Sequence, residues 1–276
     1  MFMFFGNFKI QFRIFILLTI ILLIEGFFYH YSYKLTYLCP HNFIFSQECN
    51  NPLFNPMRSG YNPIIWNENR FIETLQCIFL FLTIMYLIKV IKLNKKTKDK
   101  VFYFLLILYL VSILYFFFEE ISWGQHLFNW DSNSFFKKYN NQGETNFHNI
   151  SNLFDQLPRA LLSLWCGLSI FVFKFIKDLN IKNHYLGFIL PNNNLKYISY
   201  LTLIFIIPDL VIDKFGFHPG YSDIHTININ ITEIYDFFSF NFIRLSEFQE
   251  LIFAFYLFNH SYFMKQNFIS RTKFTK

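Results

Sequence analysis

Two adjacent carboxylates, Glu119 and Glu120, directly follow VFYFLLILYLVSILYFFF, an apolar run without a single charge. Neighbouring acids at the edge of a low-dielectric region repel each other, which favours sharing a proton or binding a divalent cation. The pair is therefore a candidate either for general acid–base catalysis or for a divalent-cation site. If the helix continues, His126 falls on the face of Glu119 and becomes a candidate for binding substrate. The alternative is two solvated glutamates that end a hydrophobic helix.

A second polar segment follows in NNQGETNFHNISNLFDQLPRALL. From Thr145 onward its apolar residues are spaced as in an amphipathic helix. Glu144 and His148 are four positions apart, so a carboxylate and an imidazole meet one substrate group or one metal ion, such as Zn²⁺ or Mg²⁺. Asn146 and Asn149 add amide groups that can bind substrate. The alternative is an interfacial helix whose polar face is in water.

The two segments together resemble a known pattern. EEISWGQ followed by NNQGETNFHN is similar to a sequence pattern of bacterial multi-pass membrane proteins to which no activity is attached. The resemblance covers about Glu119 to Asn149, and His126 stands where it leads us to expect an arginine. It implies a group of residues that act together: Glu119, Glu120, Glu144, Asn146, His148 and Asn149.

Further acids lie near the ends of other apolar runs. Asp209 follows Pro208 just inside one run, where a charge is costly and therefore a functional hypothesis, here for substrate binding. Glu247 and Glu250 open the last run. They either join a site or complement the dipole of a helix N-terminus, with Ser246 as its cap.

The elements that must position these residues are membrane helices. The chain is 54% hydrophobic and only 15% charged, against roughly 25% in soluble domains, and its mean hydropathy is +0.29. Six runs approach the length of about 20 residues that crosses a bilayer. We therefore predict one all-α membrane domain over residues 1–276, a polytopic bundle of about six spans with an amphipathic helix at the outer interface. The runs are 14–31, 75–91, 101–118, 160–176, 197–212 and 248–264.

The positive residues predict the orientation. Lysines and arginines gather before the first run, between the second and third, after the fourth and at the C-terminus. Six spans bring all four segments to one side, which the positive-inside rule makes cytoplasmic. We expect an integral protein of a bacterial inner membrane with both termini cytoplasmic, and the loops 32–74, 119–158 and 213–247 outside. The net charge of +6 then reflects contact with membrane lipids, and a nucleic-acid partner is not expected.

The four cysteines divide into two pairs. Cys77 and Cys166 lie in apolar runs, where a cysteine is a small buried filler. Cys39 and Cys49 share a loop assigned to the outer, oxidising side, which predicts a disulfide between them, with two free thiols as the alternative. The chain contains no Cys-x-x-Cys motif.

Three function classes follow from this pattern. The first is an enzyme at the outer membrane face, a hydrolase or group transferase acting on a lipid or lipid-linked substrate with Glu119, Glu120, Glu144 and His148, with or without a divalent cation. The second is a transporter or channel, which needs polar groups near the bilayer centre. There the third to fifth runs offer only Ser112, Ser163, Ser169 and Thr202, so the enzyme is favoured. The third is a scaffold without chemistry.

Overall fold

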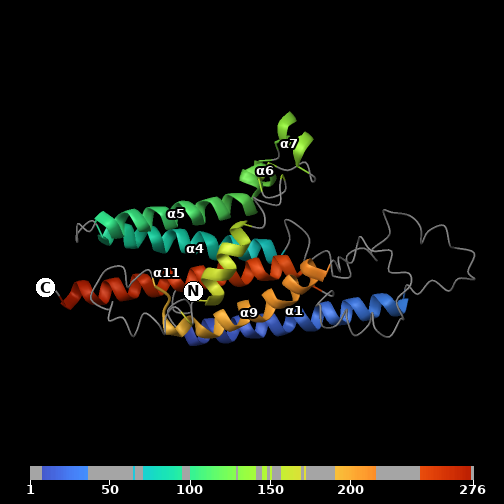
Figure 1. Cartoon of the computed structure of the whole chain (residues 1–276), viewed down its shortest axis with the longest axis horizontal. Helices are drawn as coiled ribbons and strands as arrows, with labels where there is room; N and C mark the ends of the chain where they lie inside the picture. Colours follow the sequence, from blue (N-terminus) through green and yellow to red (C-terminus); the bar gives the residue numbers. More distant parts are fainter. Residues whose placement is uncertain are drawn as a thin grey trace, which may run out of the picture. The chain divides into compact units, whose positions relative to one another are not determined.

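The structure is a computed structural model, and the part of the chain it describes is helical, without strands. Its helices and the short turns between them are drawn in Figure 1. The described residues are 8–36, 65, 71–94, 100–128, 130–140, 145–147, 150, 157–168, 171, 190–215 and 243–274.

Three helices are long and apolar enough to span a membrane. They are α1 (Phe8–Thr36), whose segment Phe8–Phe28 qualifies, α4 (Phe71–Asn94) and α5 (Lys100–Glu120). A helix satisfies every backbone hydrogen-bonding group within itself, which is what a segment surrounded by lipid requires. The first three predicted runs are thereby confirmed as helices of spanning length, and they indicate an integral membrane protein in contact with lipid.

The later apolar runs are also helical in their described parts. A shorter apolar helix covers Leu157–Leu168, followed by α9 (Lys196–Phe215) and α11 (Leu245–Phe274). Every residue of α11 from Leu251 to Ser261 is buried, as expected of a central core helix. The total of six spans remains a prediction.

The chain divides into two compact units. The first comprises Met1–Phe71 and Phe205–Phe248, and the second Ile72–Ile204 and Gln249–Lys276. In the first unit, α1 buries Phe15 and Leu22, and the Phe205 ring meets the Phe248 ring edge to face at 4.7 Å between centroids. The single membrane domain that the sequence predicts stays a prediction.

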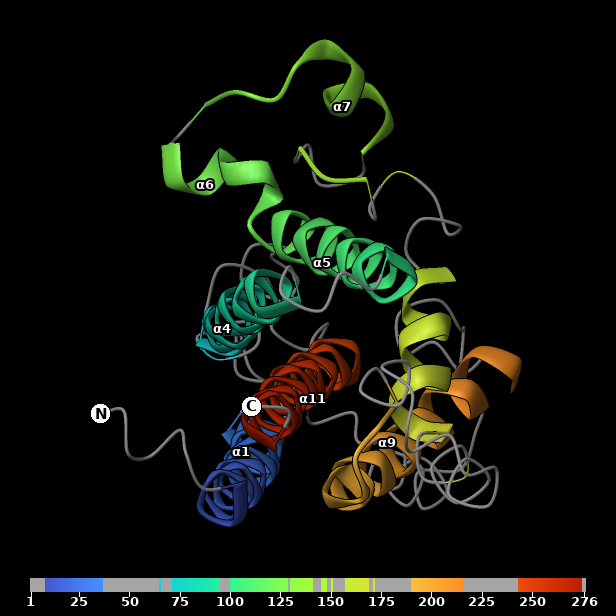
Figure 2. The ribbon, with the colours of Figure 1, turned by 90° about the vertical axis from the view of Figure 1, so that its left-hand side faces the viewer.

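In the second unit, α4, α5 and α11 lie side by side (Figure 2). Aromatic pairs define their directions. Phe79 and Tyr86 of α4 contact Phe255 and Tyr262 of α11 in the same order, so these two helices run parallel.

The direction of α5 is opposite to that of α11. Phe102 stacks on Phe268 at 5.8 Å, and Tyr109 contacts His260, which stands earlier in α11. The start of α11 therefore meets the end of α5.

Charge separates to the two ends of this bundle. At one end, Lys265 of α11 and Lys89 of α4 lie 4.8 and 6.0 Å from the ring centroid of Tyr86. Burial lowers the pKa of Lys265, and the charge of Lys89 lowers it further. The opposite end holds Glu120 and Glu250. This grouping agrees with the arrangement that the lysines predict, while the side of the membrane that each end faces stays a prediction.

Two cysteines lie in the described residues. Cys77 is half-buried, Cys166 is buried, and both are free thiols. Cys39 and Cys49 lie outside the described residues, so their disulfide stays a prediction.

Candidate functional site

Glu119, the last buried residue of α5, anchors the loop that follows the helix. Its side chain is only 4% exposed. One carboxylate oxygen accepts a hydrogen bond from the indole N–H of Trp123 at 2.7 Å, and the other accepts one from the backbone N–H of Phe147 at 2.8 Å. Both oxygens are thus engaged by the protein itself, which suits a positioning role for Glu119 better than contact with substrate.

Directly after α5 the backbone turns sharply. Ser122, Trp123 and Gly124 have φ angles of +44°, +53° and +89°. The first two are not glycine, and the left-handed conformation costs each about 1–2 kcal/mol. The hydrogen bond to Glu119 and the stacking of Trp123 on Phe118, 5.3 Å between centroids, offset this cost. Trp123 is therefore part of a specific turn and not only an interfacial anchor.

The turn changes the prediction for His126. The short helix α6 (Gln125–Phe128) begins only after the left-handed residues, so α5 does not continue through this position. The condition under which the spacing puts His126 on the face of Glu119, a continuous helix, is therefore not met, and a role of His126 in substrate binding stays a prediction. The side chain of His126 lies outside the described residues.

Asn146 belongs to the network around this turn. It is 1% exposed and accepts a hydrogen bond through its Oδ1 from the side-chain amide of Asn140, at 2.7 Å. Its own amide donates to Ser122 Oγ at 3.4 Å, and the neighbouring Thr145 N–H donates to Gln125 Oε1 at 2.6 Å. These hydrogen bonds hold the loop that contains Asn146 against the turn that contains Ser122, so the network is structural.

The predicted amphipathic helix falls mostly outside the described residues. Thr145 and Phe147 lie in bends, and Asn146 between them is not helical either. Ile150 closes a turn through its N–H to the Phe147 carbonyl at 3.0 Å. Glu144, His148 and Asn149 lie outside the described residues, so their convergence with Glu119 and Glu120 stays a prediction. The backbone of Asp209 is part of α9, but its side chain is likewise not described.

Glu120 faces a different set of partners. Carboxylate oxygens of Glu120 at the end of α5 and Glu250 in the second turn of α11 lie within 4.8 Å of each other. Glu250 also accepts a hydrogen bond from Arg159 Nη2 at 2.9 Å, and both of these side chains are 18% exposed. Three segments distant in sequence thus bring two acids and one arginine together. We call Glu120, Glu250 and Arg159 the acidic cluster.

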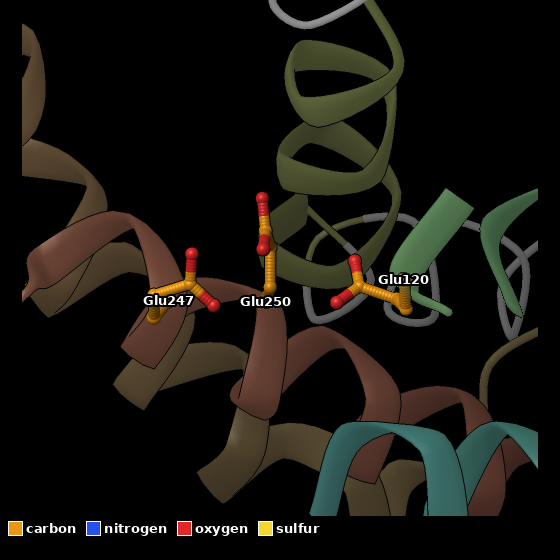
Figure 3. Close-up of side chains that lie close together, drawn as sticks. All are labelled: Glu120, Glu247 and Glu250. Atoms are coloured by element: carbon orange, nitrogen blue, oxygen red, sulfur yellow. The ribbon is translucent and has the colours of Figure 1, made fainter. Parts of the chain in front are cut away.

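Glu247 precedes Glu250 by one turn on α11, and Figure 3 shows the three glutamates. The continuous helix from Leu245 places the carboxylates of Glu247 and Glu250 on one face. Glu247 pairs with Arg244 at 3.4 Å. Because α11 begins before Ser246, that residue lies within the first turn and not at the N-cap position.

The acidic cluster has dimensions that suit a cation. Oxygen ligands sit about 2.0–2.6 Å from Mg²⁺ or Ca²⁺, so two opposite ligands are about 4–5 Å apart. The oxygens of the cluster lie within that range. Partial burial weakens solvation of the carboxylates, which raises the benefit of a positive partner.

Arg159, which precedes an apolar run, was not among the residues chosen from the sequence. For Glu250 the sequence left two alternatives, a site residue or a residue that complements the helix dipole. An arginine at the edge of a predicted span was the available signal, because a charge there needs a partner.

Comparisons with known proteins do not assign a family. No protein-family model, no curated protein and no solved structure matches the chain. A function is therefore inferred from the geometry of the residues in the acidic cluster.

Proposed function

We propose that this protein is a membrane-embedded hydrolase or group transferase that acts on a lipid or lipid-linked substrate, with a divalent cation bound by Glu120 and Glu250. The observation that carries the proposal is the approach of these two carboxylates, from α5 and α11, beside Arg159. This revises the predicted group, because Glu119 is bound to the loop and Glu120 is the carboxylate that faces other charged groups.

The place of the acidic cluster supports a lipid substrate. Glu120 ends a helix of spanning length, so the cluster belongs at the level of the lipid headgroups. The surface of α5 leading to it exposes large apolar side chains, among them Phe104, Leu108 and Val111, against which acyl chains can pack. The lysine pattern assigns this end to the outer face of the membrane.

The chemistry follows from the charges. Glu120 and Glu250 would hold the cation, which would supply Lewis-acid chemistry toward a phosphoryl or carbonyl oxygen of the substrate and toward a nucleophilic water molecule. The Arg159 guanidinium, oriented by Glu250, binds a phosphate or carboxylate oxygen of the same substrate. The carboxylate oxygen of Glu120 that does not contact the cation would accept the proton of the attacking water.

Cation binding is the first test. We expect purified protein in nanodiscs to bind Mn²⁺ or Zn²⁺ in a calorimetric titration, and Glu120→Gln or Glu250→Gln to weaken binding at least tenfold. Glu73→Gln is the matched control, because Glu73 lies in the first turn of α4, at the same end of the bundle but outside the cluster. Wild-type protein that binds neither ion, or variants that bind like wild type, would contradict the proposal.

A catalytic readout separates the enzyme from a binding protein. Protein reconstituted with a bacterial lipid extract is incubated with the ion, and the lipids are compared by mass spectrometry before and after. We expect cation-dependent loss of one lipid class with wild type and with Glu73→Gln, but not with Glu120→Gln. Unchanged lipids in all samples would rule out hydrolysis or transfer on those substrates.

A transporter or channel is the second candidate, and one observation favours it. The third to fifth runs place only serine and threonine near the bilayer centre, whereas α11 places Asn259, His260 and Ser261 in succession in the protein core. Such groups are a feature of transport paths. Flux of a labelled solute across proteoliposomes, without chemical change of any lipid, would select this candidate.

A further inference from the structure

The core helix α11 contains three consecutive buried polar residues. Asn259, His260 and Ser261 are at most 1% exposed, although Leu251–Phe258 before them is almost entirely apolar. Burying a polar group without a partner costs several kcal/mol, so such a triplet needs an explanation. For Ser261 the explanation lies within its own helix, because its hydroxyl donates a hydrogen bond to the Leu257 carbonyl at 2.5 Å.

His260 has a partner on another helix. Its Nδ1 lies 3.1 Å from the hydroxyl of Tyr109 on α5. Tyr109 stands nine positions after Lys100 and eleven before Glu120, about 14 and 16 Å from the two ends of α5. The pair is thus placed near the middle of a helix of membrane-spanning length.

Aromatic rings surround the imidazole. The Tyr256 ring stacks on it with 6.1 Å between centroids and an interplanar angle of 8°. Trp165 and Tyr109 meet it edge to face at 6.0 and 5.7 Å. The face of an aromatic ring attracts a cation, so the stacked Tyr256 ring partly offsets the loss of hydration when His260 is protonated.

The hydrogen bond to Tyr109 gives the proton a route. In the neutral tautomer that carries its proton on Nε2, His260 Nδ1 accepts a hydrogen bond from the Tyr109 hydroxyl, which keeps its own proton at neutral pH. When the hydroxyl passes its proton to Nδ1 and is reprotonated by a hydronium ion from the solvent, which leaves as water, His260 becomes positively charged and Tyr109 is unchanged. The new Nδ1–H then donates to the tyrosine oxygen, and one proton has entered the core.

Asn259 provides a further polar atom beside this pair. Its amide donates to the Phe255 carbonyl at 2.9 Å, while its buried Oδ1 accepts no hydrogen bond from the described residues. A buried acceptor left in this state is unfavourable and calls for an explanation, of which function is one. Among the described residues, the titratable groups near His260 include Tyr109 of α5, the Cys166 thiol of helix Leu157–Leu168, which interacts with Tyr109, and Tyr256 of α11.

We propose that His260 is a proton-binding site in the middle of the helical bundle, loaded and unloaded through the hydroxyl of Tyr109. This site is separate from the acidic cluster and does not depend on cation binding there. Histidine is the residue type for such a role, because its charge changes between about pH 5 and 8.

Trp165 offers a direct readout, because a protonated imidazole quenches the fluorescence of an indole ring that it contacts. We expect tryptophan emission of the full chain in nanodiscs to fall in one step as the pH is lowered from 8 to 5. Trp165→Phe identifies the part of the signal that belongs to Trp165, and His260→Gln should remove the step. No step in wild type, or a step that survives in His260→Gln, overturns the proposal.

The route through Tyr109 has its own measurement. After a rapid drop in pH, the quenching should develop at least tenfold more slowly in Tyr109→Phe than in wild type, because the hydroxyl that passes the proton is missing. Tyr103→Phe is the matched control, since Tyr103 lies on the same helix but is exposed. Equal rates in wild type and Tyr109→Phe overturn the route.

Discussion

Glu119 and Glu120 are adjacent in sequence, but their carboxylates have different partners and different proposed roles. Successive positions on an α-helix point about 100° apart. Glu119 therefore reaches the Trp123 turn and the loop, whereas Glu120 lies near Glu250, which itself pairs with Arg159. The same residue type is a structural acceptor in one place and a candidate ligand in the next.

Glutamine at position 119 should destabilise the protein. Its amide has one acceptor oxygen, so either the Trp123 or the Phe147 N–H loses its partner, at a cost of about 1–3 kcal/mol in the free energy of unfolding. Unfolding in a denaturing detergent measures this cost. Glu120→Gln is the matched control, because its half-buried side chain should affect cation binding more than stability. Equal stability of Glu119→Gln and wild type would show that the carboxylate does not hold the loop.

At the scale of the helices, small residues allow close packing. A Cβ placed on Gly167, in helix Leu157–Leu168, would lie 2.9 Å from Leu203 Cδ2 on α9. Glycine lets the two backbones approach, as in many membrane-helix contacts. The end of a leucine side chain can rotate away from one added methyl group, but it cannot make room for a large side chain.

Substitutions at Gly167 should therefore depend on size. We expect Gly167→Ala to change the free energy of unfolding by less than about 1 kcal/mol, since the better helix propensity of alanine offsets the contact. Gly167→Ile should cost about 1–3 kcal/mol through overpacking. Adding Leu203→Ala should recover part of this loss in a double-mutant cycle. If the two substitutions are simply additive, Gly167 and Leu203 are not in contact.

At the scale of the whole molecule, the main question is the path of the chain through the membrane. The confirmed lengths of α4 and α5, with charge divided between the bundle ends, predict that the residues flanking α5 face opposite sides. Single cysteines at the exposed positions Lys92 and Lys138 can show on which side of the membrane each position lies. The native cysteines are replaced by serine for this experiment. A membrane-impermeant thiol reagent added to intact cells should label position 138 and not position 92. Labelling of both positions would refute the predicted orientation.

The sequence by itself was enough to predict helices and the first three runs of spanning length. These features depend on local properties, namely the length of an apolar run and the need of the backbone to satisfy its own hydrogen bonds in lipid. It also drew attention to Glu119, Glu120 and Asn146, because polar residues next to a hydrophobic helix are conspicuous.

Only the tertiary structure decided which polar groups meet. Phe147 lies 28 positions from Glu119, and Arg159 and Glu250 are 91 positions apart, so no spacing rule relates them. His260 was overlooked for a related reason: its position inside an apolar run was visible, but its meaning depends on Tyr109, Trp165 and Tyr256 around it. Hydropathy and periodicity describe one helix at a time, whereas the chemistry of a buried charge depends on neighbours that packing brings from elsewhere in the chain.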